Sequence, residues 1–206
     1  MKPRKISGLY AITPDTDDLA DLLEKVSACL MGGARVVQYR NKIAGAPHLP
    51  MASALSALCR QYRTPLIVND DVELALEAGA DGVHLGRDDG DVAAARQKLG
   101  ADRLIGVSCY GDLQLALDAQ QAGADYVAFG SMFASGTKPH APHAPLSLLT
   151  QAAALLHIPI VAIGGITLQN ASQTIAAGAD LIAVISAVFD MPDVHKAAYK
   201  FSELFD

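Results

Sequence analysis

The chain has 206 residues, of which 51% are hydrophobic and 18% charged, a composition typical of one globular domain that spans residues 1–206. A net charge of −6 argues against an extended nucleic-acid or anionic-membrane surface. No apolar run is long enough for a membrane span, and the apolar stretch after the basic segment 1–5 ends at Pro14, too early for a signal peptide. We therefore expect a cytoplasmic protein whose three cysteines, which lack metal-binding spacing, are free thiols.

Short apolar runs alternate with helix-length segments along the whole chain. The expected strands cover residues 6–13, 34–42, 65–70, 82–86, 104–109, 126–130, 158–165 and 181–186. The expected helices cover residues 17–31, 48–63, 72–80, 91–99, 112–122, 146–156, 170–177 and 194–204. Most of the strands are continuous apolar runs, which is typical of parallel strands that are covered on both faces.

A short repeat supports this alternation. Gly-Ala-Arg at 33–35 and Gly-Ala-Asp at 79–81, 123–125 and 178–180 each separate a predicted helix from the next strand. Glycine suits the left-handed residue that ends a helix. Eight strand–helix units in one chain of this length predict an α/β fold, the closed (β/α)8 TIM barrel, with an open doubly wound sheet as the alternative. In such a barrel the functional residues lie at the carboxyl ends of the strands.

Two neighbouring strand ends carry acidic residues. Asn69 and Asp70 end the third predicted strand, and Asp89 follows the fourth, so we expect the two carboxylates to meet. Paired carboxylates beside an amide suit a hard divalent cation that is shared with a phosphorylated ligand. The alternative is helix capping, because Asp70 and Glu73 have the spacing of a capping box and Asp91 could cap the next helix.

The second predicted strand ends in polar side chains that share one face. Side chains alternate along a strand, so Gln38, Arg40 and Lys42 point the same way. One amide and two cations in register indicate a site for a diphosphate. The alternative is an ordinary solvated strand end.

The longest predicted loop, at 131–145, carries hydroxyls and one lysine. Ser135, Thr137 and Lys138 suggest a lid that closes over a phosphate, against the alternative of an ordinary surface loop. Gly165 and Ile185–Ser186 follow the last two strands, where barrels of this type recurrently bind phosphate through backbone N–H groups.

The isolated nucleophiles are interpreted more simply. Ser108 has no Asp–His partners spaced for nucleophilic catalysis, and Cys109 is expected to pack in the core. His84 lies inside an apolar strand and is expected to be a hydrogen-bonded core histidine. Two anion pockets, one metal site and no evident general base together indicate a reaction that joins two phosphorylated molecules with loss of diphosphate.

Ordered motifs extend over nearly the whole chain. They are Tyr-Ala-Ile-Thr at 10–13, Gln-Tyr-Arg-Asn-Lys at 38–42, the stretch 68–76, His-Leu-Gly at 84–86 with Asp89, Gly-Val-Ser at 106–108, Thr-Lys at 137–138, Ile-Gly-Gly-Ile at 163–166 and Ile-Ser at 185–186. In this order and spacing the chain resembles the thiamine-phosphate synthase (thiamine-phosphate pyrophosphorylase) family.

The resemblance implies a role for each of these positions. It implies that an aminopyrimidine diphosphate is held by Gln38, Arg40, Lys42, Asn69, Ser108 and Lys138. Of these, Arg40, Ser108 and Lys138 would be the catalytic groups. It implies that Mg²⁺ is bound by Asp70 and Asp89. It implies that a thiazole phosphate is held by Ser135, Thr137, Gly165, Ile185 and Ser186.

The resemblance also implies a reaction in which Mg²⁺ and the cations neutralise the departing diphosphate. The thiazole nitrogen then captures the pyrimidinylmethyl cation, and no base is required because that nitrogen carries no proton. The implied partners are these two small-molecule substrates, with no nucleic acid and no membrane. The sequence leaves open whether the chain forms a homo-oligomer.

Four positions depart from the usual family pattern. Ser131 replaces a proline, Ser135 a threonine, Arg87 a glutamine and Tyr110 a histidine, and the roles of Arg87, Ser131 and Tyr110 stay open.

Three other functions are alternatives to the synthase. A thiazole tautomerase would have a histidine at position 131 and lack the Asn–Asp pair. A silent barrel that binds thiamine precursors need not keep a leaving-group site. A phosphosugar epimerase or aldolase would need an acid/base pair or a Schiff-base lysine, and we find neither.

Overall fold

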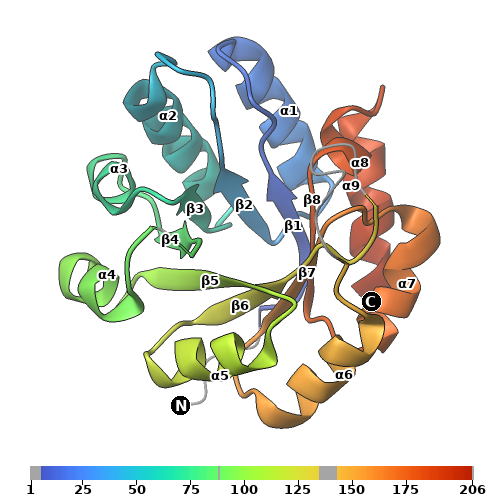
Figure 1. Cartoon of the computed structure of the whole chain (residues 1–206). Coiled ribbons are helices and arrows are strands. Elements are labelled where there is room, and N and C mark those ends of the chain that lie inside the picture. Colours follow the sequence, from blue (N-terminus) through green and yellow to red (C-terminus); the bar gives the residue numbers. More distant parts are fainter. Residues whose placement is uncertain (1–5, 88, 135–142, 206) are drawn as a thin grey trace.

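The computed structural model describes residues 6–87, 89–134 and 143–205. Its eight strands close into a parallel barrel in the order β1 to β8, and each strand pairs with the next in sequence. Figure 1 shows the helices arranged around this barrel. The predicted TIM barrel is thus confirmed, and the open-sheet alternative is excluded because β1 pairs directly with β8.

The strands are short and mostly buried along their length. They are β1 (Gly8–Ile12), β2 (Val36–Tyr39), β3 (Leu66–Asn69), β4 (Gly82–Leu85), β5 (Leu104–Tyr110), β6 (Tyr126–Phe129), β7 (Ile160–Ile163) and β8 (Leu181–Val184). Most of the observed strands are shorter than predicted, because the polar or glycine residues that were assigned to their ends belong to the loops. In particular, β2 ends at Tyr39, so Arg40 and Lys42 lie in the loop that follows it.

The helices follow their strands as expected, with one addition. They are α1 (Leu19–Met31), α2 (His48–Gln61), α3 (Val72–Glu77), α4 (Val92–Leu99), α5 (Leu113–Gln121), α6 (Leu146–Leu155), α7 (Leu168–Ala176), α8 (Ser186–Phe189) and α9 (Val194–Ser202), with a final 3₁₀ turn η1 (Glu203–Phe205). The short helix α8, directly after β8, is absent from the sequence prediction. Within the described part of the chain, no helix has both the length and the apolar character that crossing a bilayer requires.

The Gly-Ala-Asp repeat has a structural cause. All four repeat glycines adopt positive φ angles, as the helix-end interpretation predicts. The carboxylates of Asp81, Asp125 and Asp180 accept hydrogen bonds of 2.7–2.9 Å from backbone N–H groups at or near the start of β3, β5 and β7, respectively. The repeat therefore joins the amino ends of neighbouring strands, on the face opposite the expected site.

The core has two layers. A large outer cluster fills the space between the strands and the helices, and it contains all three cysteines as free, buried thiols. A smaller inner cluster fills the barrel and includes Tyr10, Ile67, Tyr126 and Leu181. Toward the carboxyl ends the inward positions on β6 and β8 are only alanines, Ala128 and Ala183, which leaves room for a cavity at that end.

Candidate active site at the carboxyl ends of the strands

A cavity of about 720 Å³ opens at the carboxyl ends of the strands, which is within the usual size of a small-molecule site. Residues from all eight strands or the loops after them line it. The lining includes seven of the predicted substrate-binding residues, namely Gln38, Arg40, Asn69, Ser108, Gly165, Ile185 and Ser186. The fold therefore collects residues that are nearly 150 positions apart in sequence around one space.

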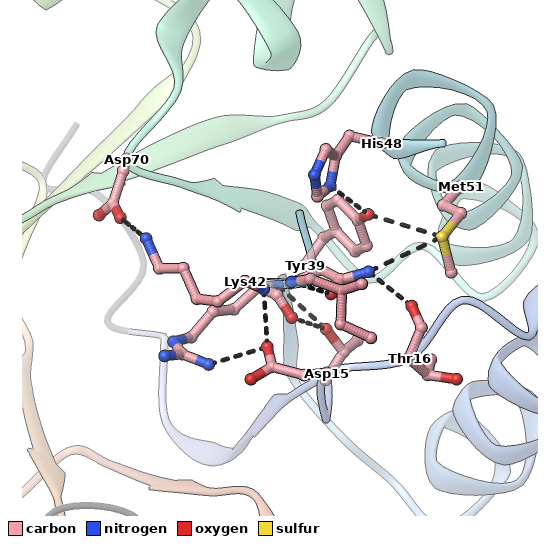
Figure 2. A network of polar contacts seen from close by, with 11 residues as sticks. Asp15, Thr16, Tyr39, Lys42, His48, Met51 and Asp70 are labelled. Atoms are coloured by element: carbon pink, nitrogen blue, oxygen red, sulfur yellow. Dashed lines mark hydrogen bonds and ion pairs between the residues drawn. The ribbon is translucent and has the colours of Figure 1, made fainter. Parts of the chain in front are cut away.

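Lys42, Asp70 and Asp89 come together beside this cavity. The ammonium group of Lys42 donates to the carboxylate of Asp70 at 2.6 Å, as Figure 2 shows. The side chains of Asp70 and Asp89 interact directly, and Asp89 also accepts a hydrogen bond of 2.8 Å from the backbone of Gly86. We refer to Arg40, Lys42, Asp70 and Asp89 as the charged rim.

The two carboxyl groups do not share their charge equally. Burial raises the pKa of Asp70, but the hydrogen bonds with Lys42 and Asp89 outweigh burial and hold that pKa below its usual value. Burial and the hydrogen bond with Asp70 raise the pKa of Asp89. Asp70 is therefore the carboxylate of the pair, and a second negative charge on Asp89 beside it is less favourable.

The capping interpretation of Asp70 is wrong by one residue. The N-cap of α3 is Asp71, whose carboxylate accepts a hydrogen bond of 2.9 Å from the backbone of Leu74. Asp70 instead adopts a left-handed conformation, with φ of 66°, which directs its side chain to Lys42. Asp91 caps α4, as predicted. With Asp71 serving as the cap, Asp70 makes no cap and its carboxylate is available for another role.

Arg40 is held by a residue that the sequence analysis missed. The carboxylate of Asp15, in the loop after β1, accepts hydrogen bonds from the guanidinium of Arg40 at 3.0 Å and from the backbone of Lys42 at 2.9 Å. The backbone of Arg40 is fixed separately, because its N–H and C=O both pair with the hydroxyl of Thr13. Asp15 follows the first predicted strand, so the same inspection of strand ends would have found it.

The floor of the cavity is built from neutral polar side chains. Gln38 Nε2 donates to the hydroxyl of Tyr10 at 2.8 Å, and the hydroxyls of Tyr10 and Tyr126 lie 2.8 Å apart. His84 connects Tyr126 and Ser108, with Nδ1 at 3.2 Å from the tyrosine hydroxyl and Nε2 at 2.8 Å from the serine hydroxyl. We refer to these five residues as the neutral floor.

His84 is the hydrogen-bonded core histidine that the sequence predicts, and it also lines the cavity. Burial lowers the pKa of His84 to about 4, against the opposing effect of the negative charge on Asp70, so its ring is neutral at physiological pH. Cys109 is not a nucleophile, because burial raises the pKa of its thiol to about 12 and keeps it protonated at physiological pH. Tyr10 and Tyr126 were not predicted as site residues, although their inward positions on β1 and β6 follow from strand alternation.

The opposite wall, after β7 and β8, consists largely of backbone. Gly165 has a φ of 63°, and a side chain there would lie 2.3 Å from the carbonyl oxygen of Ala134. The loop after β6 thus packs directly on the Gly-Gly turn. Ser186 begins α8, next to Ile185 at the end of β8.

Arg87 and Tyr110, whose roles the sequence left open, contact each other. The guanidinium of Arg87 lies 4.8 Å from the centre of the Tyr110 ring, a cation–π arrangement, and Tyr110 lines the cavity. The predicted residues Ser135, Thr137 and Lys138 lie outside the described residues.

The donor set fits a hard divalent cation with few protein ligands. Across residues 6–87, 89–134 and 143–205, no three His, Cys, Asp or Glu side chains cluster closely enough to hold a metal. Two adjoining carboxylates remain, and Mg²⁺ is commonly bound by one or two carboxylates while substrate phosphates and water supply its other ligands. Burial and the adjoining carboxyl of Asp70 raise the pKa of Asp89, so added positive charge would favour its ionised form.

Comparison with known proteins agrees with this geometry. The family model described as thiamine monophosphate synthase matches residues 9–188. Proteins named thiamine-phosphate synthase from Methylobacillus flagellatus and an Azoarcus species are 54% and 56% identical, and each alignment covers 98% of this chain and 96% or 98% of the relative.

Solved structures give the same result. A thiamine phosphate pyrophosphorylase from Pyrococcus furiosus aligns with a TM-score of 0.87 and 36% identity over 98% of this chain and 96% of that one. A 3-hexulose-6-phosphate synthase aligns with a TM-score of 0.73 at 18% identity, over 96% of this chain and 99% of that one, which reflects the shared barrel fold alone. On the family model and these full-length relatives, the chain belongs to the thiamine monophosphate synthase family.

Proposed function

We propose that the chain is a thiamine-phosphate synthase, which transfers the methylpyrimidine group of an aminopyrimidine diphosphate to the nitrogen of a thiazole phosphate and releases diphosphate. Where the thiazole carries a carboxylate, that group leaves as CO₂ and the ring becomes aromatic. The observation that carries this proposal is the meeting of two carboxylates and two cations beside one cavity, within a chain of this family. A transferase that releases diphosphate needs such a combination, whereas a barrel that only binds a precursor does not.

The charged rim is proposed to hold the leaving group. Arg40 and Lys42 supply positive charge from the loop after β2, and each is already oriented by a carboxylate, Asp15 and Asp70. Asp70 and Asp89 would hold Mg²⁺, which supplies positive charge to the diphosphate as its bond to carbon breaks. Both ion pairs are partly exposed to solvent, so an incoming diphosphate can take over the cations at modest cost.

The neutral floor is proposed to hold the aminopyrimidine ring. Gln38 and Ser108 of the floor, with Asn69 at the end of β3, line the cavity and offer amide and hydroxyl groups, which suit the amino group and ring nitrogens. Because the floor carries no formal charge, it does not compete with the charged rim for the diphosphate. The ring therefore lies in the barrel while its diphosphate reaches the rim.

The opposite wall is proposed to hold the thiazole phosphate. Gly165, Ile185 and Ser186 lie at the ends of β7 and β8, the recurrent phosphate site of this fold. By the family resemblance, Ser135 and Thr137 are assigned to this phosphate and Lys138 to the diphosphate. Substrates bound at the two sides of one cavity place the thiazole nitrogen toward the carbon that loses diphosphate.

Bond formation then needs no proton transfer by the protein. The diphosphate leaves with the bonding electron pair, and the lone pair of the thiazole nitrogen forms the new C–N bond. The state of His84, the histidine among the described residues that line the cavity, agrees with this: its pKa is lowered to about 4 and both of its ring nitrogens are engaged. We further propose that the chain works as one barrel domain, in the cytoplasm, on these small molecules rather than on nucleic acid or membranes.

The test is product formation from the two purified precursors. We expect thiamine phosphate and diphosphate in equal amounts, only when both precursors and Mg²⁺ are present. Omission of the thiazole phosphate and chelation of Mg²⁺ are the two controls. Absence of diphosphate release in the complete mixture, by a chain shown to be folded, would reject the proposed function.

A further inference from the structure

The neutral floor is a continuous chain of hydrogen bonds through the barrel interior. Its five members come from five different strands: β2, β1, β6, β4 and β5 contribute Gln38, Tyr10, Tyr126, His84 and Ser108 in turn. We propose that Tyr10, Tyr126 and His84 are positioning residues that fix the hydrogen-bonding polarity of Gln38 and Ser108 toward the cavity. This inference rests on the proposed function, because it concerns recognition of the aminopyrimidine ring.

The polarity of the chain follows from counting protons, beginning at Gln38. Its side-chain nitrogen can only donate, so the oxygen of Tyr10 accepts. The single proton of Tyr10 then has one acceptor among the described residues, the hydroxyl oxygen of Tyr126. With that direction in the tyrosine pair, the proton of Tyr126 points to Nδ1 of His84.

The count continues from His84 to the cavity. Because Nδ1 accepts, the ring proton is on Nε2, which donates to the oxygen of Ser108 at 2.8 Å. The proton of Ser108 therefore has no place within the chain and is directed to the cavity that Ser108 lines. At the other end, the amide of Gln38 keeps its carbonyl oxygen as an acceptor.

The barrel is built to make the central contact possible. His84, Gly106 and Tyr126 are aligned in register on β4, β5 and β6. A side chain on Gly106 would lie 2.0 Å from the Tyr126 ring and 2.3 Å from its hydroxyl oxygen, so only glycine lets that hydroxyl reach His84. The rings of His84 and Tyr126 stack with centres 5.6 Å apart.

Tyr126 can act on a ligand only through its neighbours. Tyr10, Gln38, His84 and Ser108 line the cavity, whereas Tyr126 lies beneath it and lines a small space toward the amino ends of the strands. The chain thus presents one donor and one acceptor as a fixed pair. An aminopyrimidine edge offers the complementary pair, a ring nitrogen for Ser108 and an amino group for Gln38.

The first test does not depend on activity. In protein labelled with ¹⁵N-histidine, we expect the His84 proton on Nε2, with His84→Gln identifying its signals among the six histidines. Tyr126→Phe removes the donor to Nδ1 and should shift that nitrogen. Tyr39→Phe is the matched control, because its hydroxyl also pairs with a histidine Nδ1, that of His48 at 3.1 Å, in the outer layer (Figure 2).

The second test is kinetic. We expect Tyr126→Phe and Tyr10→Phe each to raise KM for the pyrimidine diphosphate about tenfold with little change in kcat, since ring recognition is lost in the ground and transition states alike. The double variant should resemble either single variant, because the chain acts as a unit. Tyr39→Phe should leave KM unchanged.

Specific results would overturn the inference. A proton on Nδ1 of His84 in the unmodified chain would mean the opposite polarity. Additive effects of the two substitutions, or an equal fall of kcat without a change in KM, would make the tyrosines merely structural. If the unmodified chain forms no thiamine phosphate, the proposed function fails, while the position of the His84 proton still decides the chain's polarity.

Discussion

The charged rim and the neutral floor border the same cavity but are stabilised differently. The rim consists of ion pairs that solvent reaches: the side chain of Lys42 is 54% exposed and that of Asp70 is 27% exposed. The floor consists of buried uncharged groups, and Tyr10, Gln38, His84 and Tyr126 are at most 8% exposed.

Because of this difference, substitutions at the rim and at the floor should affect ligand binding and folding stability to different extents. Exposed ion pairs contribute little to stability and exchange partners readily, so the rim can release its cations to a diphosphate. Buried hydrogen-bonded groups leave unpaired partners behind when one member is removed, so changes in the floor should affect folding as well. Substitutions at the rim should therefore lower activity without unfolding the chain, and changes at the floor should do more to stability.

The largest expected effect is at Asp70. Asp70→Asn removes the charge that we propose binds the metal, but asparagine keeps the shape and tolerates the left-handed backbone. Turnover should therefore fall on the order of 1,000-fold with the thermal midpoint nearly unchanged. Diphosphate release at several Mg²⁺ concentrations measures this. Asp71→Asn is the control one residue away, since asparagine caps α3 equally well. Equal losses in the two variants would contradict the metal assignment.

The next effect is a pH dependence of stability that arises in the floor. Between about pH 6.5 and pH 4 the unfolded chain binds a proton at His84 that the folded chain does not take up. The free energy of unfolding should therefore fall as the pH is lowered through this window, by up to roughly 3 kcal/mol from this group, with no further loss below it.

Urea unfolding at a series of pH values measures this slope. The slope should shrink in His84→Gln and persist in His195→Gln, because His195 is exposed on α9. An unchanged slope in His84→Gln would show that the floor does not hold His84 in its neutral form.

A smaller effect is expected from Gly106→Ala. The added carbon would lie 2.0 Å from the Tyr126 ring, so the unfolding free energy should fall by about 2 kcal/mol as the floor rearranges. Gly111→Ala is the control on the same side of the barrel, because its added carbon meets Ala144 at an ordinary 3.8 Å. Chemical denaturation of both variants tests this, and equal stability of the two would mean that Gly106 is not required for space.

The smallest effect is expected from Lys42→Met at the rim. Loss of one cation should raise KM for the pyrimidine diphosphate about tenfold, while stability changes by no more than about 0.5 kcal/mol. Lys98→Met removes a similarly exposed ion pair, that with Glu73, away from the cavity. If Lys42→Met loses more stability than Lys98→Met, the rim contributes to folding stability, which contradicts the proposed difference between rim and floor.

The sequence predicted the fold and much of the rim for a topological reason. In a parallel barrel, successive strand ends adjoin, so the meeting of Asp70 and Asp89 follows once β3 and β4 are recognised. A one-residue shift at a helix start is not visible in sequence, which is why Asp70 rather than Asp71 was considered as a cap. The four-residue helix α8 is too short to show any periodicity.

The floor was harder to foresee. Tyr10 and Tyr126 are separated by 116 positions and belong to strands that are not paired with each other, so their contact depends on the width of the barrel and on the missing side chain at Gly106. In sequence both look like ordinary aromatic core residues. The sequence therefore predicts which polar residues gather at the strand ends, but it does not predict contacts between strands on opposite sides of the barrel.

The most direct test of the proposed rim is the position of a metal ion. A crystal structure of the chain with diphosphate and Mn²⁺ in place of Mg²⁺ would locate the ion by its anomalous scattering. Our account predicts one strong peak in contact with the carboxylates of both Asp70 and Asp89, with the diphosphate reaching Arg40 and Lys42. A peak that contacts neither carboxylate, or a diphosphate bound away from these two cations, would contradict it.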